Sequence, residues 1–208
     1  MSPAGPGRVG MFSVQDLRRP GLGPLSFELP QGETLAVQGP SGAGKTLLLR
    51  ALADLDPSDG QVSLDRRARE AMTGPAWRRQ VCYVAAEPGW WGETVSEHFA
   101  DWPALADLLA RLRLPAAMGA SPISQLSTGE RQRLALLRAL ELTPRVLLLD
   151  EPTGPLDDEA TEAVEDIIEE RLAQGASAVW VTHDRVQAKR IASRALTLAP
   201  DGTAEVRP

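Results

Sequence analysis

The sequence has little cysteine and no long apolar run. A single cysteine among 208 residues excludes an internal disulfide and is typical of a reducing compartment. No stretch approaches the roughly 20 apolar residues of a membrane-spanning helix, and the segment MSPAGPGRVG lacks the apolar core of a secretory signal. We therefore expect a cytoplasmic protein that reaches a membrane only through another polypeptide and inserts none of its own chain.

Excess basic charge is also absent. The chain has 22 Lys and Arg against 28 Asp and Glu, a net charge of −6. This balance gives no electrostatic footprint for nucleic acid or for an anionic lipid surface, so we expect no nucleic-acid partner. What is present, 43% hydrophobic residues, suffices for one globular domain with a packed core and room for a subdomain. Cys82 lies in the apolar run VCYV and is expected to be a buried, unreactive thiol.

Strand and helix patterns alternate along the chain. Apolar runs and two-residue alternation predict strands, and a 3.6-residue period predicts helices. The expected strands are 12–17, 24–29, 34–39, 61–65, 81–85, 145–152, 177–184 and a terminal hairpin over 196–206. The expected helices are 46–55, 93–114, 131–142, 157–175 and 185–195. The later half is a βαβ series, which predicts a parallel sheet with helices on both faces.

A glycine-rich loop follows the strand expected at 34–39. It reads GPSGAGKT and matches G-x-x-x-x-G-K-[ST] between a strand and a helix, the context of a phosphate-binding P-loop. Glycines let backbone N–H groups turn toward a phosphate, and the following helix dipole adds positive potential. We expect Lys45 to reach the β- and γ-phosphates and the Thr46 hydroxyl to bind Mg²⁺. The expected nucleotide contacts are Gly39, Pro40, Ser41, Gly42, Ala43, Gly44, Lys45, Thr46 and Leu47.

An acidic pair ends a later apolar strand. In LLLDEP, Asp150 and Glu151 leave the sheet at the carboxyl edge, where open α/β sheets bind ligands. Asp150 can hold Mg²⁺ through water, and Glu151 can act as general base on a water that attacks the γ-phosphate. A solvated loop pair is the alternative interpretation, and the P-loop in the same chain disfavours it.

The segment QLSTGERQRLALLRAL indicates the family. Leu126 to Glu130, LSTGE, open a helix between the P-loop and the DE-ended strand and resemble the LSGGQ or LSGGE signature of ATP-binding-cassette (ABC) ATPases. Five motifs occur in family order: GPSGAGKT, the YVAAEP region, LSTGE, LLLDEP with GPLD, and VTHD. The resemblance implies one α/β domain over 1–208: a RecA-like P-loop NTPase core with an antiparallel β subdomain (10–86 and 129–208) and a helical subdomain (87–128). Residues 1–9 are expected to be a flexible lead-in.

The resemblance also implies a site shared between two copies. Ser127, Gly129 and Glu130 of one copy would cap the γ-phosphate held by the P-loop of the other, giving a homodimer around two MgATP. Asp157, in GPLD, would run along that interface. His183, in VTHD, would contact the γ-phosphate and steady the attacking water, which makes Lys45, Glu151 and His183 the expected catalytic residues. A helix N-cap is a second role open to Ser127. The other histidine, His98, is given no role.

Three positions depart from the family pattern. The family has a glutamine that contacts Mg²⁺ after the strand ending in YV, and here Ala86 occupies that position, with Glu87 as a possible substitute ligand. The aromatic residue that often stacks on adenine is missing, and Arg18 or Arg19 could stack instead or remain solvated. Thr128 replaces a signature glycine, which removes some backbone freedom.

Two adjacent tryptophans, Trp90 and Trp91, follow the missing glutamine. In this family that loop lies in a groove where a short helix of the transmembrane subunit docks. We expect at least one of the two to line this groove, because tryptophan is favoured as an interface anchor. The alternative is that both cover the helices of the subdomain.

Together these features predict the ATP-hydrolysing subunit of an ABC transporter, with ATP and Mg²⁺ as ligands and an integral membrane permease as partner. The GETV segment and the WVTHD strand look like those of the ATPase subunits of iron-export systems. Small lipoprotein- or peptide-exporting cassettes are the nearest alternatives. A soluble ABC-type ATPase acting on DNA or ribosomes is the first rival, but we see none of the long coiled coils or basic patches typical of that class. A P-loop kinase of small molecules is the second, and it has no use for LSTGE or VTHD.

Overall fold

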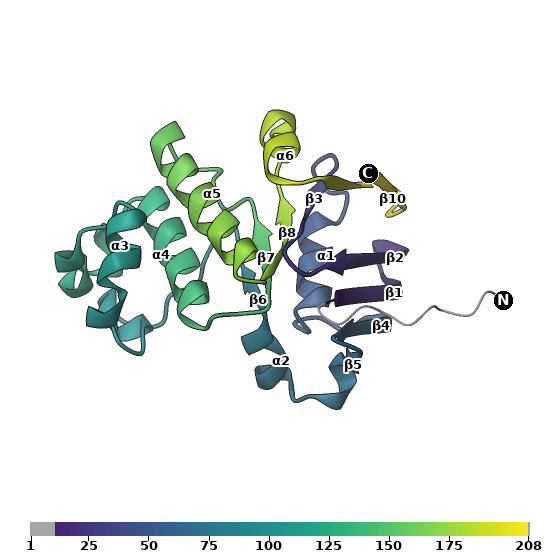
Figure 1. Ribbon diagram of the computed structural model, residues 1–208, viewed down its shortest axis with the longest axis horizontal. Helices are drawn as coiled ribbons and strands as arrows, with labels where there is room; N and C mark the ends of the chain where they lie inside the picture. The colour runs from purple at the N-terminus through teal and green to yellow at the C-terminus, as the bar shows by residue number, and fades with distance from the viewer. Residues whose placement is uncertain (1–10, 208) are drawn as a thin grey trace.

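The structure, a computed structural model, describes residues 11–207 (Figure 1). The lead-in expected over 1–9 lies outside the described residues. The strands are β1 Met11–Arg19, β2 Leu22–Pro30, β3 Thr34–Gln38, β4 Asp59–Leu64, β5 Arg67–Ala68, β6 Val81–Val84, β7 Val146–Asp150, β8 Ser177–Val181, β9 Arg194–Leu198 and β10 Ala204–Arg207. The α-helices are α1 Lys45–Leu52, α2 Gly74–Gln80, α3 Ala106–Arg111, α4 Thr128–Glu141, α5 Asp158–Ala173 and α6 Arg185–Ile191. Short 3₁₀ helices occupy Arg69–Ala71, Ser96–His98, Pro103–Leu105, Ala116–Ala120 and Ile123–Gln125.

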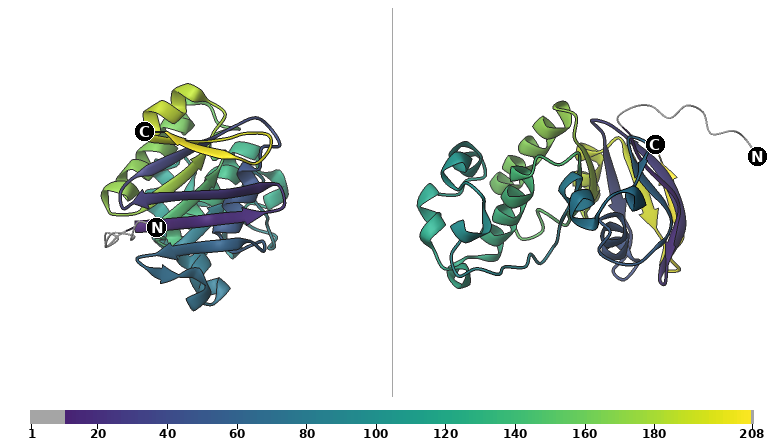
Figure 2. Two further views of the ribbon diagram at one scale, coloured as in Figure 1. Left: turned by 90° about the vertical axis from the view of Figure 1, so that its right-hand side faces the viewer. Right: turned by 90° about the horizontal axis from the view of Figure 1, so that it is seen from below.

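The strands form two sheets. The larger has the order β10-β9-β3-β8-β7-β6, and every pairing in it is parallel except that of β10 with β9. The smaller is antiparallel, with the order β2-β1-β4-β5. Figure 2 shows the two sheets at one end of the molecule and the helices of the middle segment at the other. The expected α/β class, with a parallel core and an antiparallel subsheet, is confirmed.

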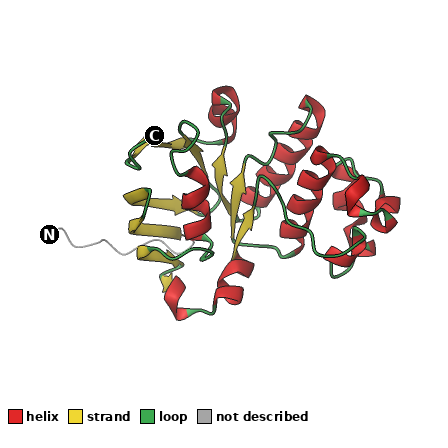
Figure 3. Cartoon of the chain, turned by 180° about the vertical axis from the view of Figure 1, so that it is seen from behind, coloured by secondary structure: helices red, strands yellow, loops and turns green. Residues whose placement is uncertain are grey.

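The continuous apolar run of β7 is explained by helices on both faces of the large sheet. Val146 and Leu148 join the core that contains α1 and the antiparallel sheet. Leu147 and Leu149 join the core formed with α3, α4 and α5. Because successive side chains of a strand point to opposite faces, a strand buried on both sides has no polar alternation. The phosphate-binding loop and the signature segment therefore start helices that pack on opposite faces, α1 and α4 (Figure 3).

The prediction of a helix over 93–114 is wrong in its first half, because α3 begins only after residue 105. The Glu97 carboxylate accepts hydrogen bonds from the amides of Glu93 and Thr94 at 2.7 and 2.9 Å. Such side-chain bonds offer the backbone an alternative to a helix. Pro103 lacks the N–H that an uninterrupted helix would use. The segment is therefore a loop held by side chains, followed by a short helix.

Two further elements differ from expectation. The last helix ends at Ile191 rather than at residue 195, because the chain enters β9 at Arg194. The short helix α2 was not expected. It has a proline in its first turn and buries Trp77, whose indole N–H donates to the Leu52 carbonyl at 2.9 Å. None of the helices between residues 11 and 207 combines the length and the apolarity needed to cross a bilayer.

Candidate nucleotide-binding site

The glycine-rich loop runs from the end of β3 into α1. Gly39, Gly42 and Gly44 have φ angles of 148°, 80° and 94°, in the region that glycine adopts far more readily than other residues. A Cβ at Gly39 would lie 2.5 Å from the carbonyl oxygen of Leu198, so a side chain there would collide with β9. The loop conformation thus requires glycine at the places where the sequence supplies it.

Lys45 is buried at the start of α1, with an exposed fraction of 7%. Its Nζ donates to the carbonyl oxygens of Gly39 and Pro40 at 2.9 and 3.0 Å. Among the described residues no carboxylate forms an ion pair with this ammonium. The Lys45 ammonium is therefore fixed beside the loop by two carbonyl groups and its charge is not neutralised by a carboxylate. Such a charge can bind an anionic ligand.

The Asp150 carboxylate, 3% exposed, lies at the carboxyl end of β7 next to α1. Its Oδ2 accepts hydrogen bonds from the Thr46 hydroxyl at 2.8 Å and from the Tyr83 phenol at 3.0 Å. Burial, and secondarily the negative charge of Asp150, raise the pKa of Tyr83 above its usual range. The expected Mg²⁺ residues, Thr46 and Asp150, are thus in direct contact, and the same carboxylate oxygen is bound by Tyr83 of the YVAAEP region, for which no role was expected.

Glu151 and His183 form a hydrogen-bonded pair. Glu151 Oε1 lies 2.7 Å from His183 Nε2, and both side chains are partly exposed. The two residues come from the ends of neighbouring parallel strands, because Asp150 is in register with Val181 of β8. The Glu151 amide also donates to the Val181 carbonyl at 3.1 Å. A carboxylate bonded to an imidazole at a sheet edge can accept and hold a proton.

A buried polar network supports the His183 loop, and no motif pointed to it. The Thr182 hydroxyl donates to Gln187 Oε1 at 2.7 Å, and Gln187 Nε2 donates to Thr153 Oγ1 at 2.9 Å and to Glu165 Oε1 at 2.8 Å. Gln187 is 3% exposed. The network ties the residue before His183 to the segment after Glu151. Sequence patterns do not reveal such a link, because its members are up to 34 residues apart.

The signature residues stand apart from this cluster. Ser127 is the N-cap of α4 and forms a capping box with Glu130: its hydroxyl accepts from the Glu130 amide at 3.2 Å and donates to Glu130 Oε2 at 2.8 Å. The Ser127 amide also donates to Glu130 Oε2 at 2.8 Å, and this bond, followed by that from the Ser127 hydroxyl, lowers the pKa of the Glu130 carboxyl. Gly129 adjoins Leu156, and Asp157 caps α5 by accepting from the Ala160 amide at 2.8 Å. Within residues 11–207 no hydrogen bond or ion pair joins any of these signature residues to the P-loop, Asp150 or Glu151.

Two of the departures from the family pattern lie on the loop after β6 and at the end of β1. Ala86 and Glu87 are both exposed on the loop after β6. Arg19 is bound to Asp56, with its Nη1 2.6 Å from Oδ2, while Arg18 is exposed and lies 3.8 Å from Asp59. Arg50 and Arg19 together hold the pKa of Asp56 well below its usual range. Of the two arginines considered for stacking on adenine, only Arg18 has a largely free side chain.

The two tryptophans face different environments. Trp91 is 72% exposed, whereas Trp90 is partly buried against the core around α4. Trp91 therefore does not point into the core, while Trp90 packs against it. The guanidinium of Arg138, from α4, lies 4.8 and 4.7 Å from the centres of the Trp90 and Trp91 rings and donates to the Gly89 carbonyl at 3.2 and 3.3 Å. Two cation–π contacts therefore fix this loop against α4.

His98, for which no role was expected, organises the same loop. It is 5% exposed, and its Nε2 accepts hydrogen bonds from the amides of Trp91 and Gly92 at 3.0 and 2.9 Å. Its ring also contacts the rings of Trp90 and Trp91 at centroid distances of 5.0 and 4.7 Å. The histidine is a structural residue that holds Trp91 at the surface.

A groove of about 360 Å³ lies beside Trp91, between α4 and the loop after β6. Its lining is mainly apolar, with Arg138 and Glu141 as charged groups; it includes Cys82, Tyr83, Val84, Ala85, Pro88, Gly89, Trp91, His98, Ala135, Arg138, Ala139, Glu141 and Leu142. Burial lowers the pKa of Arg138. Burial also raises the pKa of the Cys82 thiol to about 11, so the thiol is protonated at neutral pH although it is only partly buried. This agrees with an unreactive cysteine.

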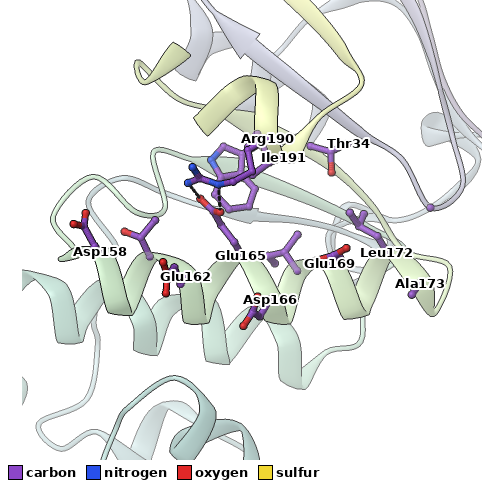
Figure 4. Close-up of a pocket in the computed structure, with 14 residues that line it drawn as sticks. Thr34, Asp158, Glu162, Glu165, Asp166, Glu169, Leu172, Ala173, Arg190 and Ile191 are labelled. Carbon is purple, nitrogen blue, oxygen red and sulfur yellow. Dashed lines mark hydrogen bonds and ion pairs between the residues drawn. The ribbon is translucent and has the colours of Figure 1, made fainter. Parts of the chain in front are cut away.

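A larger cavity, of about 730 Å³, lies between α5, α6 and the start of β3 (Figure 4). Carboxylates line it, among them Asp158, Glu162, Asp166 and Glu169, and Glu165 is bound by both Nε and Nη2 of Arg190 at 2.7 and 2.8 Å. An anionic triphosphate is repelled by such a lining. The glycine-rich loop, with the unneutralised Lys45 ammonium, is better suited to an anionic ligand than this cavity.

Comparison with known proteins agrees with this geometry. The sequence matches the family described as "ABC transporter" over residues 22–154. It is 35% identical over 191 residues to the "Probable iron export ATP-binding protein FetA" of Escherichia coli (strain K12), covering 86% of this chain and 84% of that protein. It is 38% identical over 191 residues to the "Cobalt import ATP-binding protein CbiO" of Rhodobacter capsulatus, covering 83% and 68%. A solved structure described as the ATP binding subunit of an ABC transporter matches with a TM-score of 0.84 at 26% identity, covering 94% of this chain and 89% of that chain.

The chain belongs to the ABC transporter family. It is an ABC ATPase of the α/β P-loop type, and ATP and Mg²⁺ are the ligands of that family.

Proposed function

We propose that this chain binds and hydrolyses ATP for a transporter whose membrane-spanning part is a separate polypeptide. One observation carries the proposal: at the edge of the sheet, beside an unneutralised lysine, the Thr46–Asp150 contact and the Glu151–His183 contact supply a metal site and a base. A P-loop kinase needs only the first of these contacts. Phosphoryl transfer to water needs both, because the water must be oriented and deprotonated.

The residues have distinct roles in this proposal. The amides of residues 39–47 and the Lys45 ammonium bind the phosphates, the Thr46 hydroxyl binds Mg²⁺, and Asp150 holds Mg²⁺ through water. When bound, Mg²⁺ neutralises charge on the β- and γ-phosphates. Glu151 takes a proton from the attacking water, and His183 holds Glu151 in place through the 2.7 Å contact while facing the γ-phosphate.

The site is completed by a second copy of the chain. Ser127, Gly129, Glu130 and Asp157 lie in caps of α4 and α5, away from the P-loop of the same chain. The N-terminus of the 14-residue helix α4 is a place where backbone N–H groups favour an anion. In a head-to-tail homodimer each α4 N-terminus would face the triphosphate on the other copy. The core over 10–86 and 129–208 and the subdomain over 87–128 remain our proposed division of the domain.

The groove beside Trp91 is the surface we assign to the permease. Trp91 is 72% exposed although it is a large aromatic residue, and Leu142 in the same lining is 45% exposed. A helix of an integral membrane protein that fills this groove would remove both from water. The chain would then sit on the cytoplasmic face of the membrane through its partner.

Replacing Trp91 by alanine tests this docking. With a tagged chain isolated from detergent-solubilised membranes, we expect recovery of the multi-span membrane protein to fall by about tenfold or more, as for a hot-spot tryptophan. Val186→Ala is the control, because Val186 is 70% exposed on α6, outside the groove. Equal recovery by folded Trp91→Ala protein excludes the docking site. A wild-type chain that recovers no membrane protein excludes the transporter and favours a soluble ABC-type ATPase.

Iron export is the finer proposal, and it follows from the likeness to FetA. Cells that lack the chain are then expected to retain more iron than parent cells when iron is supplied in excess, and restoring the chain should reverse this. Measuring total cell iron decides the point. A lower iron content would indicate import, the direction in the name of the CbiO relative.

A further inference from the structure

We propose that Tyr83 is a positioning residue for the metal site, because its phenol binds Asp150 Oδ2 and leaves Oδ1 available to a hydrated Mg²⁺ that would bind there. This inference rests on the proposed function in one respect, namely that Asp150 serves Mg²⁺. It adds a residue that lies outside the P-loop, the signature and the acidic pair.

The strand register brings the phenol to Asp150. β6 pairs with β7 in parallel, and Tyr83 lies opposite Leu148. Leu148 is two residues before Asp150, so both side chains of the Tyr83–Asp150 pair lie on the same face of the sheet. The Tyr83 hydroxyl donates to Asp150 Oδ2 at 3.0 Å, across 67 positions of sequence. The Thr46 hydroxyl reaches the same oxygen from α1 at 2.8 Å.

Both donors converge on one oxygen of the carboxylate. A carboxylate oxygen has two lone-pair sites, so the two hydroxyls fill those of Oδ2. Oδ1 accepts no hydrogen bond from the residues the structure describes. The carboxylate is thus fixed by one oxygen and leaves the other available, an arrangement that would suit a hydrated Mg²⁺.

The burial of Asp150 makes these two bonds important. The residue is 3% exposed and forms no ion pair within residues 11–207. A buried carboxylate without a cation needs hydrogen-bond donors. Tyr83 is itself packed against the core around α1, so its ring has little freedom to move away. A phenol is protonated at neutral pH, so Tyr83 can donate this hydrogen bond.

The nearby side chains offer no substitute. Ala86 has no polar group, and Glu87 is exposed on the loop beyond the strand. On β6 and the loop after it, Tyr83 is therefore the side chain that contacts the metal-site carboxylate. Without the Tyr83 hydroxyl, the Thr46 hydroxyl would be the only hydrogen-bond donor to the Asp150 carboxylate among residues 11–207.

The test is Tyr83→Phe in the full chain, with ATPase activity measured against Mg²⁺ concentration at saturating ATP. We expect the half-saturating Mg²⁺ concentration to rise about five- to tenfold, the size expected for the loss of one hydrogen bond of average strength. Turnover at saturating Mg²⁺ should stay within about twofold of the wild-type value, because the base and the phosphate contacts are intact. Thr34→Val is the control, because it removes a buried hydroxyl of β3 that forms no hydrogen bond with the residues the structure describes.

A spectroscopic measurement follows the same group directly. Tyr83 is the single tyrosine of the chain, so ¹³Cζ-tyrosine labelling gives one resonance. We expect it to shift when Mg²⁺ is added to nucleotide-saturated wild-type protein, with a midpoint equal to that of the activity. An unmoved resonance, or equal Mg²⁺ dependence in Tyr83→Phe and wild type, overturns the positioning role. A wild-type protein without any Mg²⁺-dependent ATPase activity overturns the proposed function instead.

Discussion

Glu151→Gln is expected to lower ATP turnover by about a hundredfold or more while leaving ATP binding intact. The carboxylate Oε1 lies 2.7 Å from His183 Nε2 at the edge of the sheet, where an attacking water can be deprotonated. An amide has nearly the same shape but cannot take the proton, and general-base catalysis contributes roughly 10²–10⁴-fold. Because the phosphate contacts are unchanged, ATP should remain bound and hold two copies together. Steady-state turnover and size-exclusion chromatography with MgATP measure the two effects.

The matched control is Glu169→Gln, which alters an exposed glutamate of α5 without touching the site. Its turnover should equal that of the wild type. Turnover at the wild-type rate in Glu151→Gln would show that another group is the base. A strictly monomeric Glu151→Gln protein at saturating ATP would contradict the shared site.

Two separately inactive variants are expected to restore activity when mixed. Lys45→Ala removes the ammonium over the glycine loop, and Ser127→Arg places a bulky cation at the α4 N-terminus. In a head-to-tail dimer each site combines Lys45 of one copy with Ser127 of the other. A mixed dimer therefore has one doubly defective site and one intact site. In an equal mixture, about half of the dimers are mixed, and each mixed dimer has one intact site of two. About a quarter of all sites are then intact, so we expect about a quarter of the wild-type activity.

ATPase activity of the mixture, compared with the sum of the two variants alone, is the measurement. Mixing Lys45→Ala with Glu151→Gln is the control, because Lys45 and Glu151 serve the same site from the same copy. In that mixture each site of a mixed dimer keeps one defect, and no recovery is expected. Equal recovery in both mixtures, or none in either, contradicts the head-to-tail arrangement.

The parts of the site that could be predicted are those set by local backbone chemistry. Positive φ angles at Gly39, Gly42 and Gly44 are accessible chiefly to glycine, so the loop can be identified from its residues. The placement of Asp150 and Glu151 follows from the apolar strand before them, which must be buried and must end at a sheet edge. The capping role of Ser127 follows from the Glu three positions later.

The parts that were missed depend on particular side-chain hydrogen bonds, some to backbone a few residues away and some between distant segments. The helix expected over 93–114 failed because Glu97 and His98 bind backbone amides of the preceding loop. Arg138 then holds that loop from a helix about 50 positions away, at the Gly89 carbonyl. Periodicity of apolar residues carries no information about such bonds.

The sequence alone determined the P-loop, the acidic pair, the signature and the α/β class, because each depends on short-range backbone preferences or on burial of an apolar run. Only the tertiary structure decided which side chains meet. It placed Tyr83 and Thr46 on one oxygen of Asp150, joined Glu151 to His183, and left Trp91 exposed beside a groove. The physical reason is that these contacts depend on strand register and on packing across the sheet, which link positions up to 104 residues apart.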